Sequence, residues 1–210
     1  MRLSNRIVLA SLNRHKLEEF QALLRNHPEV ELVPVSGLIR NPEGLSQVEK
    51  HATYLENAAA KARLVNQGCH YPALADDSGL EVFALDGKPG VRSHRFAIPR
   101  KGESQDDANN SLLLKELSGK SSRDARFVCV VGLVIEGVMI HAEGTLEGTL
   151  LESPRGDHGF GYDPLFVPKG FNKSLAEMEA AEKNQISHRA KALQLLMTKI
   201  KDHGITFAKP

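Results

Sequence analysis

Apolar positions near the start of the chain change from a continuous run to a helical spacing. The run at residues 6–10 predicts a buried first strand, because a strand covered on both faces carries apolar side chains without interruption. The next apolar positions follow an i, i+3, i+6, i+7 spacing, which predicts an amphipathic helix: Leu17, Phe20, Leu23 and Leu24. Residues 31–35 predict a second short strand, and residues 36–47, which contain two glycines and a proline, predict a loop.

A polar cluster in the middle of the chain separates two apolar runs. Residues 72–75 predict a buried strand that stops at Asp76 and Asp77, and the Ser-Gly pair that follows predicts a turn before residues 80–85. The two carboxylates would then lie at the carboxyl end of a strand, where open α/β sheets bind ligands. Successive strand side chains point to opposite faces, so we expect one carboxylate to face a site and the other to support it. Taken alone, the stretch is better explained as an ordinary turn.

The remaining patterns predict an α/β fold. Residues 49–67 are rich in alanine and predict a helix that starts near Glu49, where the helix dipole alone would explain an acid. Further helices are expected at residues 106–117 and, as one long final helix, at residues 182–203. Strands are expected at residues 125–136, 138–144 and 165–167, with the first two forming a hairpin and residues 145–151 continuing the sheet after a break at Gly144.

Composition narrows the class of protein. A length of 210 residues suits one large α/β domain or two lobes of one. The 27 basic and 26 acidic residues nearly balance, which argues against a surface that coats a polyanion. Cys69 and Cys129 lie in apolar contexts without metal-site spacing, so we interpret both as small core residues. The N-terminal apolar run is too short for a signal peptide or a membrane span, so we expect an intracellular, cytoplasmic protein.

Two loops carry residues suited to a nucleotide. Residues 11–16 join the first strand to the first helix, a geometry that points backbone N–H groups at an anion. Lys16 lies in the first turn of that helix, where the helix dipole disfavours a cation, so its presence suggests a phosphate partner. The alternative for this loop is an ordinary Ser or Asn helix cap. Residues 156–164 place two aromatic rings between glycines, which suits stacking on a base, although a turn-rich loop explains them equally well. Residues 87–100 form either a solvated basic loop or a cationic lid.

Four motifs together resemble one family. They are Ser-x-Asn-x-x-Lys at residues 11–16, Ala-Asp-Asp-Ser-Gly-Leu at 75–80, Gly-Phe-Gly-Tyr-Asp-Pro at 159–164 and Ser-His-Arg at 187–189. In this order and spacing they resemble the inosine triphosphate pyrophosphatase family, also called XTP/dITP diphosphatases, which remove non-standard purine nucleotides. The resemblance covers nearly the whole chain. It implies a single domain over residues 1–210, an elongated mixed β-sheet with flanking helices in two lobes around a nucleotide cleft, a homodimer and Mg²⁺.

The resemblance also implies roles for individual residues. Asp77 matches the metal ligand and base, and Glu49 the second acidic metal ligand; whether Asp76 or Asp77 is the base stays open. Arg95 resembles the basic residue of the opposite lip of the cleft. Phosphate and substrate contacts are implied for Ser11, Leu12, Asn13, Arg14, His15, Lys16, Lys61, Ser78 and Lys183. The base pocket is implied for Phe160, Gly161, Tyr162, Asp163, His188 and Arg189. Leu12 and His158 stand where the family usually has glycine.

These residues predict a metal-assisted hydrolysis. Mg²⁺ on Glu49 and Asp77 would neutralise phosphate charge while water attacks the α-phosphorus, which yields a nucleoside monophosphate and pyrophosphate. His188 and Arg189 donate hydrogen bonds, so they suit the 6-oxo group of hypoxanthine or xanthine and not the 6-amino group of adenine. The alternatives are a non-catalytic nucleotide sensor, which would not need two acids, and a related pyrophosphatase for methylated or pyrimidine nucleotides, against which the Ser-His-Arg motif argues.

Overall fold

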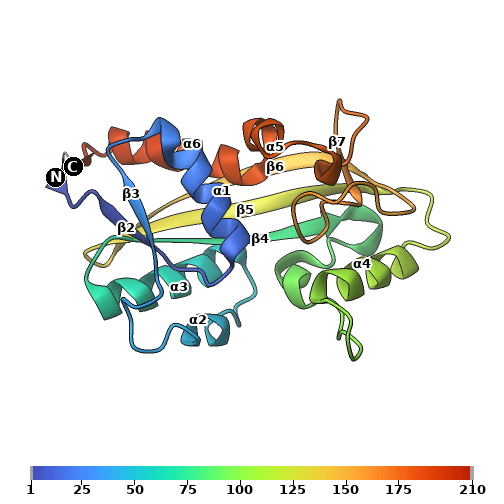
Figure 1. Ribbon diagram of the computed structural model, residues 1–210, viewed down its shortest axis with the longest axis horizontal. Helices are drawn as coiled ribbons and strands as arrows, with labels where there is room; N and C mark the ends of the chain where they lie inside the picture. The colour runs from blue at the N-terminus through green and yellow to red at the C-terminus, as the bar shows by residue number, and fades with distance from the viewer. Residues whose placement is uncertain (1, 209–210) are drawn as a thin grey trace. The chain divides into compact units, whose positions relative to one another are not determined.

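The computed structural model describes residues 2–208, which form two compact units (Figure 1). Within that range the first unit comprises residues 2–77, 129–144 and 189–208, and the second comprises residues 78–128 and 145–188. The chain passes from one unit to the other inside three long strands, β4 (Ala73–Val82), β5 (Asp124–Ile135) and β6 (Val138–Leu150), and at the start of helix α6 (His188–Asp202).

Six strands of the described chain form one mixed sheet in the order β3-β2-β4-β5-β6-β7. Strand β2 (Arg6–Leu9) pairs in parallel with both β3 (Glu31–Pro34) and β4. Strand β6 pairs antiparallel with β7 (Phe166–Pro168), with Thr149 opposite Val167. A separate parallel pair joins β1 (Arg2–Leu3) to β8 (Thr206–Phe207). The mixed α/β sheet expected from the sequence is therefore confirmed.

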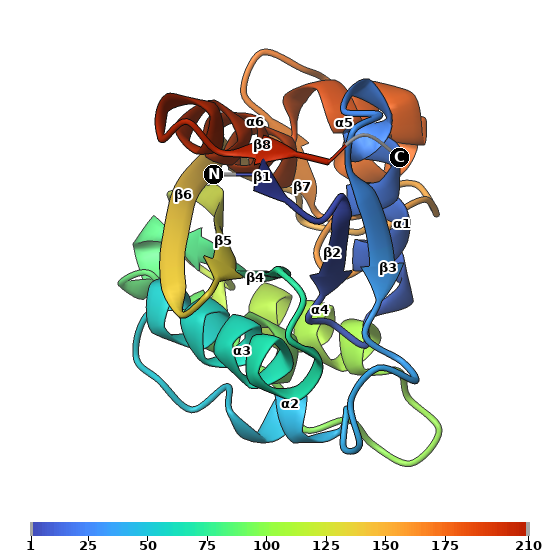
Figure 2. The same cartoon turned by 90° about the vertical axis from the view of Figure 1, so that its left-hand side faces the viewer.

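Helices cover both faces of the sheet in the first unit, because its buried strands are apolar on both faces. Ile7, Leu9 and Leu74 pack in a core with residues of helices α1 (Arg14–Leu23) and α6. Val8, Ala73 and the other alternate positions pack in a second core with helix α3 (Tyr54–Cys69). Figures 1 and 2 show α3 and α6 on opposite sides of β4. The two-residue alternation of strand side chains thus assigns each position of β2 and β4 to one helical layer.

The second unit has its own core under helix α4 (Gln105–Glu116). Leu80 and Val82 of β4 pack there with Leu113 of α4 and Phe127 of β5. The shorter elements of this unit are the 3₁₀ helices η2 (Phe83–Leu85), η3 (Gly90–Arg95) and η4 (Leu175–Glu177) and helix α5 (Ala180–Ile186). In the first unit, η1 (Leu24–Asn26) extends α1, and the short helix α2 (Gly44–Gln47) lies in the segment expected to be a loop.

Two strand boundaries predicted from the sequence are wrong. Strand β4 runs through Asp76 and Asp77 to Val82, so the expected turn does not form and the carboxylates lie within the strand. Their charges are matched by cations from the helices, which allows polar residues to continue a buried strand. Strand β6 likewise runs through Gly144 without a break, since the alternation of buried and exposed residues passes through that position unchanged.

Two helix boundaries also differ from expectation. The final helix is two helices, α5 and α6, separated by Ser187 in an extended conformation with ψ of 152°. Serine is favoured at the position just before a helix starts, so Ser187 was a signal in the sequence for this break. Helix α3 begins at Tyr54, after Thr53 accepts a hydrogen bond from the Glu56 N–H, so Glu49 lies in the preceding loop. The helix dipole therefore does not explain Glu49.

The hairpin between β5 and β6 is confirmed. Its two turn residues, Glu136 and Gly137, have φ values of 47° and 82°, the left-handed conformation that two-residue hairpin turns require. Within residues 2–208, no helix has both the length and the apolar composition needed to cross a membrane.

Candidate active site

The loop of residues 11–16 is shaped by its own side chains. Asn13 caps α1 by accepting a hydrogen bond from the Lys16 N–H at 3.2 Å, and Ser11 Oγ accepts one from the Asn13 N–H at 3.2 Å. The first turn of α1 contains basic residues and no acid, against the preference of the helix dipole. Leu12, at the usual glycine position, points its side chain partly into solvent and is 49% exposed. The capped helix start thus presents Lys16 toward strand β4.

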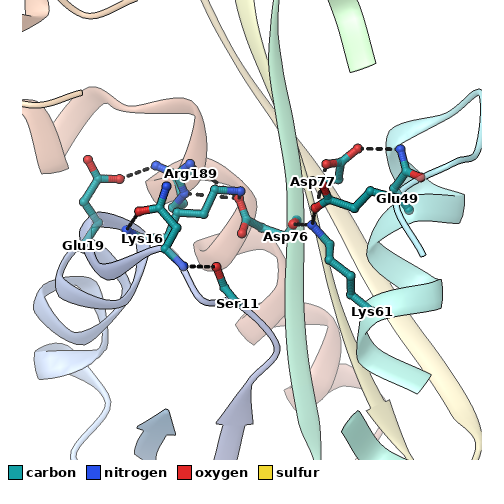
Figure 3. A network of polar contacts seen from close by, with 10 residues as sticks. Ser11, Lys16, Glu19, Glu49, Lys61, Asp76, Asp77 and Arg189 are labelled. Atoms are coloured by element: carbon teal, nitrogen blue, oxygen red, sulfur yellow. Dashed lines mark hydrogen bonds and ion pairs between the residues drawn. The ribbon is translucent and has the colours of Figure 1, made fainter. Parts of the chain in front are cut away.

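The carboxylate of Asp76 is surrounded by cations from two helices. Lys16 Nζ lies 2.9 Å from Asp76 Oδ2, and a terminal nitrogen of Arg189 lies 3.4 Å from the same oxygen. Arg189 also makes an ion pair with Glu19 of α1. Figure 3 shows these four residues together on one side of β4. Both side chains of the Asp76–Arg189 pair are almost fully buried, so this network is part of the interior of the first unit.

The carboxylate of Asp77 faces helix α3 on the other side of β4. Asn57 Nδ2 donates a hydrogen bond to Asp77 Oδ2 at 3.0 Å. Lys61 Nζ lies 3.6 Å from Asp77 Oδ1 and 2.5 Å from Glu49 Oε1, and it also donates to the backbone oxygen of Asp76 at 2.6 Å. Lys61 therefore brings Glu49 and Asp77, the two predicted metal ligands, around one ammonium group (Figure 3).

The two aspartates have opposite pKa shifts. Burial would raise the pKa of Asp76, but Lys16, Arg189 and Lys61 outweigh it and hold that pKa well below its usual value. Burial raises the pKa of Asp77, and Lys61 and Lys16 only partly offset the effect. Burial alone would lower the pKa of Lys61, but the negative charges of Asp76, Asp77 and Glu49 outweigh this effect and raise that pKa. Asp76 is therefore a fixed anion, and Asp77 is the better proton acceptor of the two.

Glu49 and Asp77 fit a metal that is shared with a substrate. No group of three or more His, Cys, Asp or Glu residues with metal-site geometry occurs in the described part of the chain. A Mg²⁺ ion bound to a nucleotide takes one or two protein carboxylates, and water and phosphate oxygens complete its coordination. Two carboxylates that already share the positive charge of Lys61 suit that arrangement.

The glycine-rich loop of the second unit is organised around Asp163. Asp163 Oδ2 accepts a hydrogen bond from the Phe160 N–H at 3.0 Å and lies 2.6 Å from Lys183 Nζ. Lys183 Nζ also lies 5.0 Å from the centre of the Phe160 ring. A Cβ at Gly159 would come within 2.1 Å of the Asp163 carboxylate, so only glycine fits there. The loop therefore holds a half-buried Phe160 ring beside a buried ion pair.

The predicted base pocket and phosphate contacts are distributed over both units. Phe160 to Asp163 and His188 belong to the second unit, where the His188 ring stacks on Phe127 with centroids 4.7 Å apart. Arg189 pairs with acids of the first unit, and Lys183 pairs with Asp163 in the second. Arg95 lies in η3 with an exposed side chain, and Ser78 follows Asp77 in β4. The structure thus groups Ser11, Lys16, Glu49 and Lys61 with the aspartates, and Lys183 with the aromatic loop.

The comparison with protein families agrees with these motifs. The model of the Ham1 family matches residues 7–199.

The chain belongs to the Ham1 family.

Relatives of this Ham1-family chain carry a consistent name. A dITP/XTP pyrophosphatase of Ralstonia nicotianae is 46% identical over 199 residues, which cover 93% of this chain and 96% of the relative. Another dITP/XTP pyrophosphatase, from Exiguobacterium sp., is 43% identical over 196 residues, 93% of this chain and 96% of the relative. The structure of a HAM1 protein from Coxiella burnetii matches with a TM-score of 0.78 and 38% identity over 94% of this chain and 98% of that one. The family recognised from the four motifs is confirmed.

Several residues around the candidate site received no role from the sequence. Glu19 follows Lys16 by three positions on α1, and Asn57 precedes Lys61 by four on α3, so each lies on the same helix face as a predicted residue. Asn57 is also a poor helix former within an alanine-rich helix, which was a usable signal. Asp106 and Asn110 of α4 bind the backbone of Gly161, and no local pattern indicates that contact.

Proposed function

We propose that this chain is a nucleoside triphosphate pyrophosphatase that removes non-standard purine nucleotides such as ITP, dITP and XTP. It converts each triphosphate to the nucleoside monophosphate and pyrophosphate. The observation that carries the proposal is the convergence of Lys16 and Lys61 on the two adjacent aspartates of β4. A triphosphate brings about four negative charges, and cations already gathered by buried acids are preorganised to receive them.

The two aspartates have different roles in this proposal. Asp77 orients the attacking water and accepts its proton, because burial favours the protonated form of this carboxyl group. Asp76 remains ionised and fixes Lys16 and Arg189 in place. Lys16 and the backbone of residues 11–16 bind phosphate oxygens at the start of α1. The open choice between Asp76 and Asp77 as the base is thus made in favour of Asp77.

Glu49 and Asp77 would hold Mg²⁺, and the metal, when bound, supplies positive charge for the phosphate oxygens. Lys61 contacts both carboxylates, so it keeps them close together while their negative charges repel each other. Besides the metal, the ammonium group of Lys61 also adds to the positive charge that faces the phosphates.

The base end of the substrate is assigned to the loop of residues 159–163. Phe160 stacks on the purine, and the Asp163–Lys183 pair holds the loop backbone beneath that ring. The stacking of His188 on Phe127 fixes the plane of the imidazole ring. A fixed ring plane lets His188 direct its N–H group at the 6-oxo group of the base. Arg189 is the second donor that the family resemblance implies. Homodimer formation, which the resemblance implies, and a cytoplasmic location are further parts of the proposal.

A substrate panel tests the function. ITP, XTP, dITP, GTP and ATP are incubated with the protein and Mg²⁺, and the products are separated by ion-exchange chromatography. We expect rapid turnover of the first three, with monophosphate and pyrophosphate as products, and no turnover in excess chelator. Diphosphate and phosphate as products would contradict the attack at the α-phosphorus. Nucleotide binding without turnover would favour the non-catalytic sensor.

A further inference from the structure

Two side chains of helix α4 hold Gly161 by both of its backbone polar groups. The Gly161 N–H donates to Asp106 Oδ2 at 2.7 Å, and Asn110 Nδ2 donates to the Gly161 carbonyl oxygen at 2.9 Å. Asp106 and Asn110 are four residues apart in α4, so they lie one turn apart on the same helix face. Helix α4 thus pairs with both backbone groups of Gly161, as a neighbouring β-strand would, but it does so through side chains.

Gly161 has a conformation that needs such support. Its φ is 65°, in the left-handed region that glycine adopts at little cost. A Cβ at this position would meet no atom within 4 Å, so glycine is required here for the backbone conformation and not for space. Because Phe160 and Tyr162 flank it, the orientation of the Gly161 peptide determines where both aromatic side chains point.

Helix α4 is itself well anchored. Ser104 caps its first turn, and Asn109 accepts from the Ala97 N–H at 2.9 Å and donates to the His94 carbonyl at 3.1 Å. On the loop side, the Tyr162 hydroxyl donates to the Ser93 carbonyl oxygen at 2.9 Å. The helix and the loop are therefore both hydrogen-bonded to the segment of residues 93–97, so the contacts to Gly161 belong to one connected part of the second unit.

We propose that Asp106 and Asn110 are positioning residues for purine recognition. By binding both polar groups of Gly161 they set the angle of the Phe160 ring, and so determine how well a flat base stacks on it. This inference rests on the proposed function, in which the loop of residues 159–163 receives the base. It assigns to α4 a role that no motif of the sequence indicates.

The hydrogen-bonding state of Asn110 separates this role from a structural one. Among the described residues, its buried Oδ1 atom has no hydrogen-bond partner, while Nδ2 serves Gly161. A buried acceptor without a partner is unfavourable, so an apolar residue of similar shape removes that cost while it gives up the hydrogen bond to Gly161, and the two effects on folding offset each other in part. The donor group of Asn110, which binds Gly161, is therefore the part of this side chain that the structure uses.

The test compares binding at the two ends of the nucleotide. The variants are Asp106→Ala, Asp106→Asn and Asn110→Leu, with Asp107→Asn as a matched control, because Asp107 is an exposed acid in the same helix turn. Each is assayed for ITP turnover, for inhibition by inorganic tripolyphosphate, which lacks a base, and for its thermal unfolding midpoint. Asp106→Asn keeps an oxygen that can accept from the Gly161 N–H.

We expect Asp106→Ala and Asn110→Leu to raise the KM for ITP by about tenfold, the effect of losing one hydrogen bond that positions the ring. Inhibition by tripolyphosphate should stay at the wild-type level, and Asp106→Asn and Asp107→Asn should retain a KM close to wild type. Asn110→Leu should unfold within a few degrees of wild type. General destabilisation would not weaken ITP binding while it leaves tripolyphosphate binding unchanged.

Three results would overturn the positioning role: an unchanged KM in Asp106→Ala, a parallel loss of tripolyphosphate inhibition, or an Asp106→Asn variant as impaired as Asp106→Ala. A Phe160→Ala variant, measured alongside, separates this failure from that of the proposed function. If Phe160→Ala weakens ITP and Asp106→Ala does not, the base pocket stands and the positioning role fails. If Phe160→Ala has no effect, the base pocket itself is refuted, and the positioning role with it.

Discussion

Asp76 and Asp77 are adjacent in β4, yet their carboxylates belong to opposite faces of the sheet. Asp76 pairs with Lys16 and Arg189, whereas Asp77 binds Asn57 and lies near Lys61 of α3. One strand therefore supplies a fixed anion to one helical layer and a protonatable group to the other. The backbone oxygen of Asp76 accepts a hydrogen bond from Lys61 at 2.6 Å, which connects the two sides through a single peptide.

The Asp77→Asn variant should fold and lose its activity. An amide oxygen can still accept the hydrogen bond from Asn57, so we expect a thermal midpoint near wild type. It cannot accept a proton or offer a carboxylate to a metal, so kcat for ITP should fall by at least about 100-fold. Pyrophosphate release measures the rate, and near-wild-type activity in the folded variant would refute the role of Asp77.

The Lys16→Ala variant tests the phosphate contact at the start of α1. Loss of this cation should raise the KM for triphosphates by about tenfold or more, because a charged hydrogen bond to substrate is lost in ground and transition states alike. Arg25→Ala removes an exposed cation just beyond α1 and serves as the control. If kcat and KM are unchanged in Lys16→Ala, Lys16 serves only as the ion partner of Asp76.

Glu19 and Glu18 offer a matched pair for stability on α1. Glu19→Ala should lower the free energy of unfolding by about 3 kcal/mol, because it leaves the buried Arg189 with one carboxylate fewer. Glu18→Ala breaks only the exposed i,i+4 pair with Arg14 and should cost less than about 0.5 kcal/mol. Urea unfolding measures both, and equal effects would show that the Glu19–Arg189 pair contributes no more than a surface contact.

Arg189→Ala tests base discrimination. If Arg189 donates to the 6-oxo group, as the family resemblance implies, the preference for ITP over ATP in kcat/KM should fall by about tenfold or more. Its ion pairs with Glu19 and Asp76 suggest a second outcome. An equal loss for ITP and ATP would mean that Arg189 acts through Asp76, and the selectivity would then have to come from the second unit.

The two cysteines should differ in reactivity. Burial raises the pKa of the Cys129 thiol to about 12, with Asp76 contributing in the same direction, so its thiolate form is scarce at pH 8. Cys69 is only half-buried at the end of α3. Iodoacetamide should therefore label Cys69 and spare Cys129 in the folded chain, as peptide mass spectrometry would show. Labelling of Cys129 at the same rate would indicate that the core of the first unit opens readily.

The sequence by itself determined the strands and helices with a clear apolar pattern, such as β2, α1 and the β5–β6 hairpin. It also determined that Asp76 and Asp77 point to opposite faces, because the alternation of side chains is a property of any extended strand. The motifs identified the family, since four short patterns in one order carry more information than any one of them.

Tertiary structure alone decided where polar residues are accommodated. A local reading of Asp-Asp-Ser-Gly predicts a turn, but ion pairs from α1, α3 and α6 make a continuous buried strand the more stable choice. The Arg189–Glu19 pair joins residues 170 positions apart, and the Asp106–Gly161 hydrogen bond joins residues 55 apart. Such contacts depend on which helix faces pack together, and no local propensity encodes them.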